Sequence, residues 1–211
     1  HRIARRQRQM CIRDRVDVKS LYQKIKDKTT IDVSNCLVRG FSLSEYRSKF
    51  NLNQNEKIDL IDFCANDALF ESEKVVDFSL ANFTGTKADF TNAHFGSGNL
   101  SFLKAEFGNF PVSFKGTSYS EGNNIFQYAK FNSGKVNFDN ATFENGNLSF
   151  INTYFGDGNV TFKNVHFGNG DVSFAFATFK KGSVIFDKSI FNGDEINFSK
   201  VDFGNGKVDF R

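Results

Sequence analysis

Residues 131–155 read FNSGKVNFDNATFENGNLSFINTYF, and Phe returns in this stretch at alternating intervals of seven and five residues. The same spacing extends in both directions, so that a twelve-residue unit with two aromatic positions recurs without a slip from residue 78 to residue 210. An internal repeat of this kind decides the class of fold. The aromatic positions, which we predict to form a structural core ladder, are Phe78, Phe83, Phe90, Phe95, Phe102, Phe107, Phe114, Tyr119, Phe126, Phe131, Phe138, Phe143, Phe150, Phe155, Phe162, Phe167, Phe174, Phe179, Phe186, Phe191, Phe198, Phe203 and Phe210.

Two further positions complete the unit. An aliphatic residue such as Val136 stands two residues before one Phe, and a small residue such as Ala141 stands two residues before the other. The alternation V-x-F is typical of a short strand with one buried face. The intervening segments are rich in Gly and Asn, which tolerate the positive φ angles of tight corners. The sequence therefore predicts strands and corners in strict alternation, as in a coil.

The number of aromatic rings indicates the size of one turn of the coil. A turn closed by a single twelve-residue unit would be overfilled by two Phe and one aliphatic side chain. Two units, about 24 residues with four sides, leave room for stacked rings, and neighbouring turns then pair as parallel strands about 4.8 Å apart. Counted from residue 31, the chain makes about seven turns of an all-β parallel β-helix, whose units bury their apolar faces only by stacking.

The residues around each Phe resemble a known family. At residues 81–85, ANFTG, a small residue and a gap precede a central Phe that is followed by a short polar pair. This pattern resembles the pentapeptide-repeat family, in its Phe-centred variant with longer spacing, over residues 76–211. The resemblance implies a right-handed quadrilateral β-helix with the central Phe and the preceding Ala or Val inside. The two residues inserted on alternate sides depart from the plain five-residue pattern.

The pattern divides the chain into four segments. Apolar residues at three- and four-residue spacing predict an amphipathic helix over about 17–28, and the segment 16–29 is expected to cap the first turn. Residues 30–82 are expected to form irregular first turns with long loops at about 39–57 and 66–75. Residues 83–211 form the regular β-helix, which we expect to be truncated, because Arg211 falls nine residues into a twelve-residue unit. An open parallel edge at that end would invite pairing.

The first segment, residues 1–15, reads HRIARRQRQMCIRDR and carries six Arg against one Asp. Back-translated, residues 5–15 resemble the transposase adapter of sequencing libraries, so we interpret the segment as an adapter-derived artefact and not as a nucleic-acid-binding arm. The full chain has a formal charge of +3, and without this local +5 the remainder carries −2. The basic character of the protein thus lies in these fifteen residues.

No pattern in the sequence predicts catalysis. It shows no nucleophile with a base, no glycine loop opening a helix and no paired catalytic carboxylates, and we expect no cofactor and no metal site. Phe110 and Tyr128 break the repeat and are predicted to be exposed aromatics, which makes them a possible interaction surface. We therefore predict a non-enzymatic structural or protein-interaction module that binds another protein, not nucleic acid or a membrane. Cysteines without a disulfide framework favour the cytoplasm.

An alternative function follows from the family resemblance. Some pentapeptide-repeat proteins imitate the shape and negative charge of duplex DNA and thereby bind DNA gyrase. This mimicry requires an acidic surface. Residues 83–211 hold twelve basic and twelve acidic residues, and this neutral balance disfavours a DNA mimic.

Overall fold

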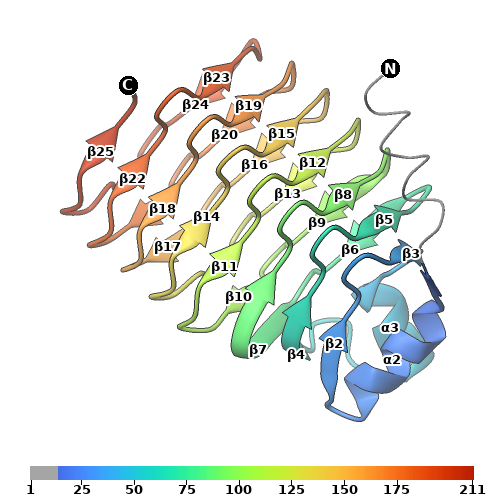
Figure 1. Ribbon diagram of the computed structural model, residues 1–211. Helices are drawn as coiled ribbons and strands as arrows, with labels where there is room; N and C mark the ends of the chain where they lie inside the picture. The colour runs from blue at the N-terminus through green and yellow to red at the C-terminus, as the bar shows by residue number, and fades with distance from the viewer. Residues whose placement is uncertain (1–13) are drawn as a thin grey trace.

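The computed structural model describes residues 14–211, and the adapter-like residues 1–13 lie outside the described part of the chain. The chain winds into a stack of coils, with two short helices at the N-terminal end (Figure 1). All strand pairings are parallel and join one coil to the next. This arrangement confirms the predicted all-β parallel solenoid, although it has about eight turns and not seven, since one face is a ladder of eight consecutive strands.

One turn contains 24 residues in the regular part, because Val136 pairs with Val112 in the coil before it and with Val160 in the coil after it. Each turn has four sides, which we number in chain order. Side 1 consists of β2 (Thr30–Asp32), β4 (Ile58–Cys64), β7 (Ala81–Asp89), β11 (Val112–Ser113), β14 (Val136–Asn137), β18 (Val160–Thr161), β22 (Val184–Ile185) and β25 (Val208–Asp209). Side 2 consists of β1 (Arg15–Val16), β3 (Leu37–Arg39), β5 (Leu69–Glu71), β8 (His94–Phe95), β12 (Ser118–Tyr119), β15 (Thr142–Phe143), β19 (His166–Phe167) and β23 (Ile190–Phe191).

The other two sides close the coil. Side 3 consists of β6 (Val75–Asp77), β9 (Asn99–Ser101), β13 (Asn124–Ile125), β16 (Leu148–Ser149), β20 (Val172–Ser173) and β24 (Ile196–Asn197). Side 4 contains β10 (Glu106–Phe107), β17 (Tyr154–Gly156) and β21 (Thr178–Phe179), together with the first halves of β4 and β7. Lys130 completes side 4 through single bridges to Glu106 and Tyr154.

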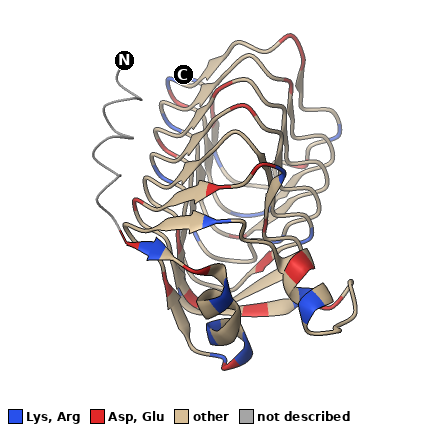
Figure 2. Cartoon of the chain, turned by 90° about the vertical axis from the view of Figure 1, so that its right-hand side faces the viewer, with Lys and Arg blue, Asp and Glu red and all other residues tan. Residues whose placement is uncertain are grey.

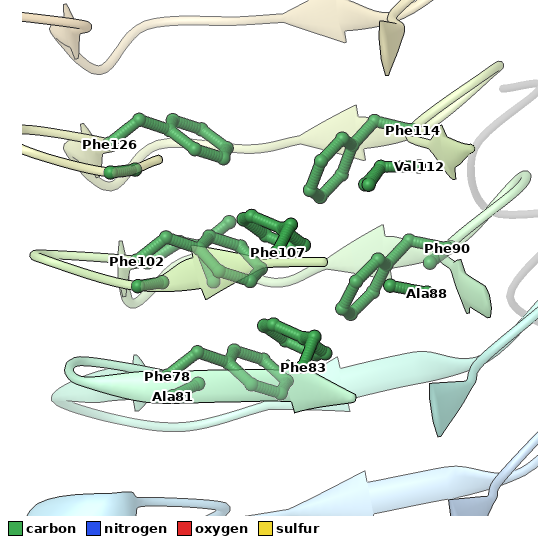
Figure 3. Close-up of a cluster of buried hydrophobic side chains, with 14 of the residues drawn as sticks. Phe78, Ala81, Phe83, Ala88, Phe90, Phe102, Phe107, Val112, Phe114 and Phe126 are labelled. Atoms are coloured by element: carbon green, nitrogen blue, oxygen red, sulfur yellow. The ribbon is translucent and has the colours of Figure 1, made fainter. Parts of the chain in front are cut away.

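The interior is a set of aromatic ladders. Phe138 stacks on Phe114 with ring centroids 4.7 Å apart and on Phe162 at 5.1 Å, with the planes within 9° of parallel. Rings from opposite sides meet edge to face, as Phe126 meets Phe138 at 85°. Figure 3 shows this packing for the coils around Phe102. Each buried Phe contributes about 1.5–3 kcal/mol by removing its ring from water, so the ladders supply the main stabilisation.

Burial along the ladder changes only near its C-terminal end. From Phe78 to Phe186 every ladder residue is at most 2% exposed. Phe191, Phe198 and Phe203 are partly buried, and Phe210 is 54% exposed. The reason is geometric, because no further coil lies over the last turn of the described chain.

Helix α2 (Val18–Lys26) covers the first turn at the opposite end, close to the predicted span of 17–28. The Asp17 side chain caps it by accepting a hydrogen bond from the Lys19 N–H at 3.0 Å. Leu21, Tyr22 and Ile25 are buried, and the Tyr22 hydroxyl donates to the carbonyl of Ser42 at 2.7 Å. Neither helix in the described residues has the length and apolar character needed to cross a membrane.

The segment predicted as a loop at 39–57 contains helix α3 (Leu43–Lys49), so that prediction is wrong for these residues. The sequence carries a signal for this helix, because Ser42 and Glu45 stand at the spacing of a capping box. The Ser42 Oγ accepts a hydrogen bond from the Glu45 N–H at 3.2 Å.

The prediction of a long loop at 66–75 is also wrong, because this segment contains a regular side of the coil, β5. Phe70 is buried and pairs with Phe95 of the next coil. The repeat is hidden here because Phe70 stands eight residues before Phe78, where later coils have seven. One extra residue in the corner therefore interrupts the sequence pattern without interrupting the ladder.

Two buried charged residues fasten α3 to the coil. The Arg47 guanidinium donates to the carbonyls of Glu56 at 2.7 Å and Ser79 at 2.6 Å. The Asp77 carboxylate accepts hydrogen bonds from the Ser44 N–H at 2.9 Å and the Ser44 hydroxyl at 2.6 Å. Burial raises the pKa of Asp77, but the hydrogen bonds from Ser44 and Ser79 outweigh burial and hold that pKa below its usual value.

Candidate interaction surface

The corners of the coil carry most of the exposed side chains, and they alternate in length. Two residues form the corners between sides 1 and 2 and between sides 3 and 4, which we call corners 1/2 and 3/4. Four residues form corners 2/3 and 4/1. In corners 1/2 and 3/4 the second residue has a φ of 53° to 66° from Leu80 onward, a left-handed conformation that suits Gly and Asn.

Corners 1/2 and 3/4 share this backbone but differ in side chains. Corner 1/2 places mostly Asn or Gly at the left-handed position, in the order Asn92, Gly116, Asn140, Asn164 and Lys188. Corner 3/4 has Leu80, Lys104, Tyr128, Asn152, Phe176 and Lys200 there. A bulky residue in this conformation costs about 1 kcal/mol relative to the favoured residues. Corner 3/4 thus holds large apolar side chains where Asn would be the more stable choice.

Tyr128 and Phe176 form what we call the aromatic ridge. Their side chains are 50% and 47% exposed, and they lie two turns apart, which corresponds to about 10 Å. The Lys200 ammonium lies 5.0 Å from the centre of the Phe176 ring. Ile190 and Phe210 are also exposed large apolar residues in the described chain, but both lie in its last two coils.

The second aromatic predicted to be exposed, Phe110, is buried, with 8% of its surface accessible. Its ring folds back over Gly108, where an added Cβ would overlap the ring atoms. Glycine at that position leaves the room that the ring fills. The prediction is therefore wrong for Phe110, which lies in corner 4/1, while Tyr128 is exposed in corner 3/4.

The four-residue corners sort the charged residues by sign. Corner 2/3 forms an acidic edge, with Glu71, Glu73, Glu121, Glu144, Asp171, Asp194 and Glu195 against Lys74. Corner 4/1 forms a basic edge, with Lys87, Lys135, Lys180, Lys181 and Lys207 against Asp157. From residue 71 onward, seven acids less one base give −6 on the acidic edge, and five bases less one acid give +4 on the basic edge. The preceding coil adds Arg39 to the acidic edge and Asp62 to the basic edge. The two edges lie diagonally opposite on the coil, whose charged residues Figure 2 colours by sign.

A groove of about 990 Å³ lies at the N-terminal end of the acidic edge, between α3 and corner 2/3. Its walls include Glu45, Glu73, Glu121 and Glu144. An ion pair between Arg39 Nε and a Glu71 carboxylate oxygen, 2.8 Å apart, offsets part of this charge. Among residues 14–211, no group of three or more His, Cys, Asp or Glu side chains is placed to hold a metal ion.

The charged edges are hidden in the total charge of residues 83–211, because the basic and acidic residues cancel. A signal was present, since residues 24 positions apart share a corner, and sorting the charged residues by this period separates the signs. Comparison with known proteins adds no constraint on function. No protein-family model matches the chain, and no curated protein matches it.

Proposed function

We propose that this chain is a pentapeptide-repeat protein that acts as a non-enzymatic interaction module and binds a protein partner through the aromatic ridge. The family assignment rests on the buried central Phe of each unit and on the small residue two places before it, as in Phe83 and Ala81. The longer corners 2/3 and 4/1 distinguish this chain from the plain five-residue pattern.

The exposure of Tyr128 and Phe176 at left-handed positions of one corner carries the functional proposal. Backbone strain of this kind persists where function requires it, and aromatic residues dominate the binding energy of protein interfaces. Stability alone would place Asn at these positions, as it does in corner 1/2. The rings are thus retained at a cost to the folded state, which indicates selection for contact with a partner.

The surroundings of the aromatic ridge indicate the chemistry of that partner. Lys104 and Lys200 occupy left-handed positions of the same corner, below and above the two rings. Lys130 lies on the adjoining side 4, where its ammonium is 3.2 Å from a Glu106 carboxylate oxygen. A partner surface with two apolar pockets flanked by carboxylates matches this arrangement.

A double variant, Tyr128→Asn with Phe176→Asn, tests the proposal without disturbing the coil, because Asn suits the left-handed backbone. A protein captured from source-cell lysate by the wild type is expected to bind the double variant about a thousandfold more weakly, at roughly 2 kcal/mol for each lost ring. Lys188→Asn, at the equivalent position of corner 1/2, is the matched control and is expected to bind normally. Equal affinity of the wild type and the double variant for every captured protein would refute the proposal.

The DNA-mimic alternative makes a different prediction. Its acidic charge would have to cover a broad surface, whereas only seven of the 24 acids lie on the acidic edge and a row of lysines lies on the opposite corner. We expect DNA gyrase to supercoil plasmid DNA at the same rate with and without an excess of this protein. Clear inhibition of supercoiling would favour the alternative.

A further inference from the structure

We propose that copies of this chain associate side by side, with the basic edge of one rod against the acidic edge of the next. A single molecule carries both edges, on diagonally opposite corners, so each rod offers two complementary surfaces to others of its kind. Charge complementarity along an interface directs association and excludes mismatched pairings. The occupant of each edge is therefore a second copy of this chain.

The spacing of the charges supports this pairing. Both edges belong to the same coil and repeat every 24 residues, so their charges rise with the same step of about 4.8 Å. We call the corner residues of one coil a level. When two rods lie parallel and in register, most charged levels of the basic edge face a level of opposite sign on the acidic edge. The facing groups are Lys87 with Glu71 and Glu73, Lys135 with Glu121, Lys180 and Lys181 with Asp171, and Lys207 with Asp194 and Glu195.

The remaining levels are consistent with the parallel arrangement. Residues 108–111 of the basic edge and residues 96–99 of the acidic edge carry no charge, and these levels face each other. Two like-charged pairs remain, Lys87 with Lys74 and Asp157 with Glu144, and Asp157 is already held by Lys181 at 3.0 Å. In the antiparallel arrangement Lys180 and Lys181 would face the uncharged residues 96–99. The charge pattern thus favours rods that point the same way.

This geometry determines the form of the assembly. Parallel rods in contact through two different edges are related by a translation, and such a contact does not close on itself. Each added rod leaves one basic and one acidic edge free, so association continues into rows. The residues involved also keep exposed partners within their own rod, as Lys180 does with Asp202 at 3.7 Å. Such surface pairs contribute little and can be exchanged for contacts with another molecule.

The contact between two edges is narrow, so the association is expected to be weak. Eight turns correspond to a rod about 38 Å long, and two corners that meet along this length bury less than the roughly 800 Å² per partner of a standard stable interface. The attraction between exposed charges is screened beyond about 8 Å at physiological ionic strength. We therefore expect weak association that strengthens as salt is removed.

Sedimentation velocity on three proteins tests the proposal. They are the wild type, Lys180→Glu with Lys181→Glu on the basic edge, and Glu121→Lys with Asp194→Lys on the acidic edge. The wild type is expected to sediment faster with increasing concentration in about 20 mM salt, and to remain monomeric in about 0.5 M salt. Each double variant alone is expected to self-associate at least tenfold more weakly. Residues 1–15 are identical in the three proteins, so their arginines cannot explain a difference.

Mixing the two variants provides the decisive measurement. The first variant keeps its acidic edge and the second keeps its basic edge, so the mixture is expected to regain the association that each variant lacks. A wild type that stays monomeric in low salt, or a mixture that stays monomeric, would overturn the proposal. So would association that persists in high salt, because salt screens the charges on which this contact depends. Tyr128→Asn with Phe176→Asn is expected to leave self-association unchanged, which separates this surface from the aromatic ridge.

Discussion

The interior and the corners of this solenoid use the same repeat in opposite ways. Inside, nearly every turn has the same aromatic rings at the same places, so one coil is equivalent to the next. At the corners the residues differ from turn to turn, but residues of one kind gather on one corner. The comparison shows that a uniform core fixes the position of each surface residue. The surface can then be varied freely, and overall composition says little about it.

Substitution of an interior ring is expected to have the largest effect. Phe150 stacks between Phe126 at 4.8 Å and Phe174 at 4.9 Å. Phe150→Asp places a carboxylate inside this stack and is expected to lower the free energy of unfolding by about 4 kcal/mol or more. Urea denaturation followed by circular dichroism measures the loss.

The neighbouring residue provides the control. Ser149 points outward from side 3, so Ser149→Asp is expected to change stability by less than about 0.5 kcal/mol. If both substitutions are tolerated equally, the distinction between the interior and the surface positions is wrong.

Asp77 tests the N-terminal end, where the regular interior meets the inserted helix. Asp77→Asn removes the charge that accepts hydrogen bonds from Ser44 and Ser79 and is expected to cost about 2 kcal/mol at neutral pH. The pKa of Asp77 is lowered in the folded state. Its contribution is therefore full above about pH 4, the ordinary Asp pKa, and is lost as the pH falls through the lower folded pKa.

The difference in stability between the wild type and Asp77→Asn is thus expected to shrink as the pH falls from about 5 to about 3. Urea denaturation at several pH values measures this difference. A gap that stays constant over that range would show that the Asp77 charge does not stabilise the fold.

Tyr119 is the one ladder position that is not Phe, and its substitution is expected to have a smaller effect of opposite sign. Its hydroxyl is buried without a hydrogen-bond partner among the described residues. Tyr119→Phe removes this unsatisfied group and keeps the stack with Phe143, so it is expected to raise the free energy of unfolding by about 1 kcal/mol. A loss of stability in thermal or urea denaturation would mean that the hydroxyl has a partner.

The smallest effects are expected at the left-handed corner positions. Tyr128→Asn is expected to stabilise the protein by about 0.5 kcal/mol, and Asn140→Tyr on corner 1/2 is expected to destabilise it by a similar amount. Thermal denaturation of the two variants under identical conditions compares them. If Tyr128→Asn instead destabilises the protein, the ring stabilises the fold, and its exposure no longer indicates a binding function.

Much of the fold could be predicted from the sequence, because the interior has a strict period. Phe at alternating intervals of five and seven residues is sufficient to place two units in a turn and to separate inside from outside. The first turns could not be assigned in the same way, because their corners change length. Ile58 pairs with Ala81, 23 residues later, and Phe63 pairs with Ala88, 25 residues later. Such changes keep the ladder intact and destroy the period.

The surface was harder to predict for a different reason. The exposure of a corner residue depends on its neighbours in adjacent coils, as Phe110 shows by folding over Gly108. Phe176 keeps the interior pattern of its unit and differs only in the aromatic ring at the left-handed corner position, so the core repeat gives no signal for it. The charged edges emerge only when residues are compared at a period of 24, which is twice the repeat seen in the sequence.

The uniform register also has a genetic consequence. Loss of residues 136–159 would join Lys135 to Val160, which occupies the same place in the next coil as Val136 does in its own. Every interior ladder would close again, but Tyr128 and Phe176 would then lie one turn apart instead of two. Duplication of a coil would separate them further. Unequal recombination within the gene can therefore change the spacing of these two rings in steps of one coil, with no new core to evolve.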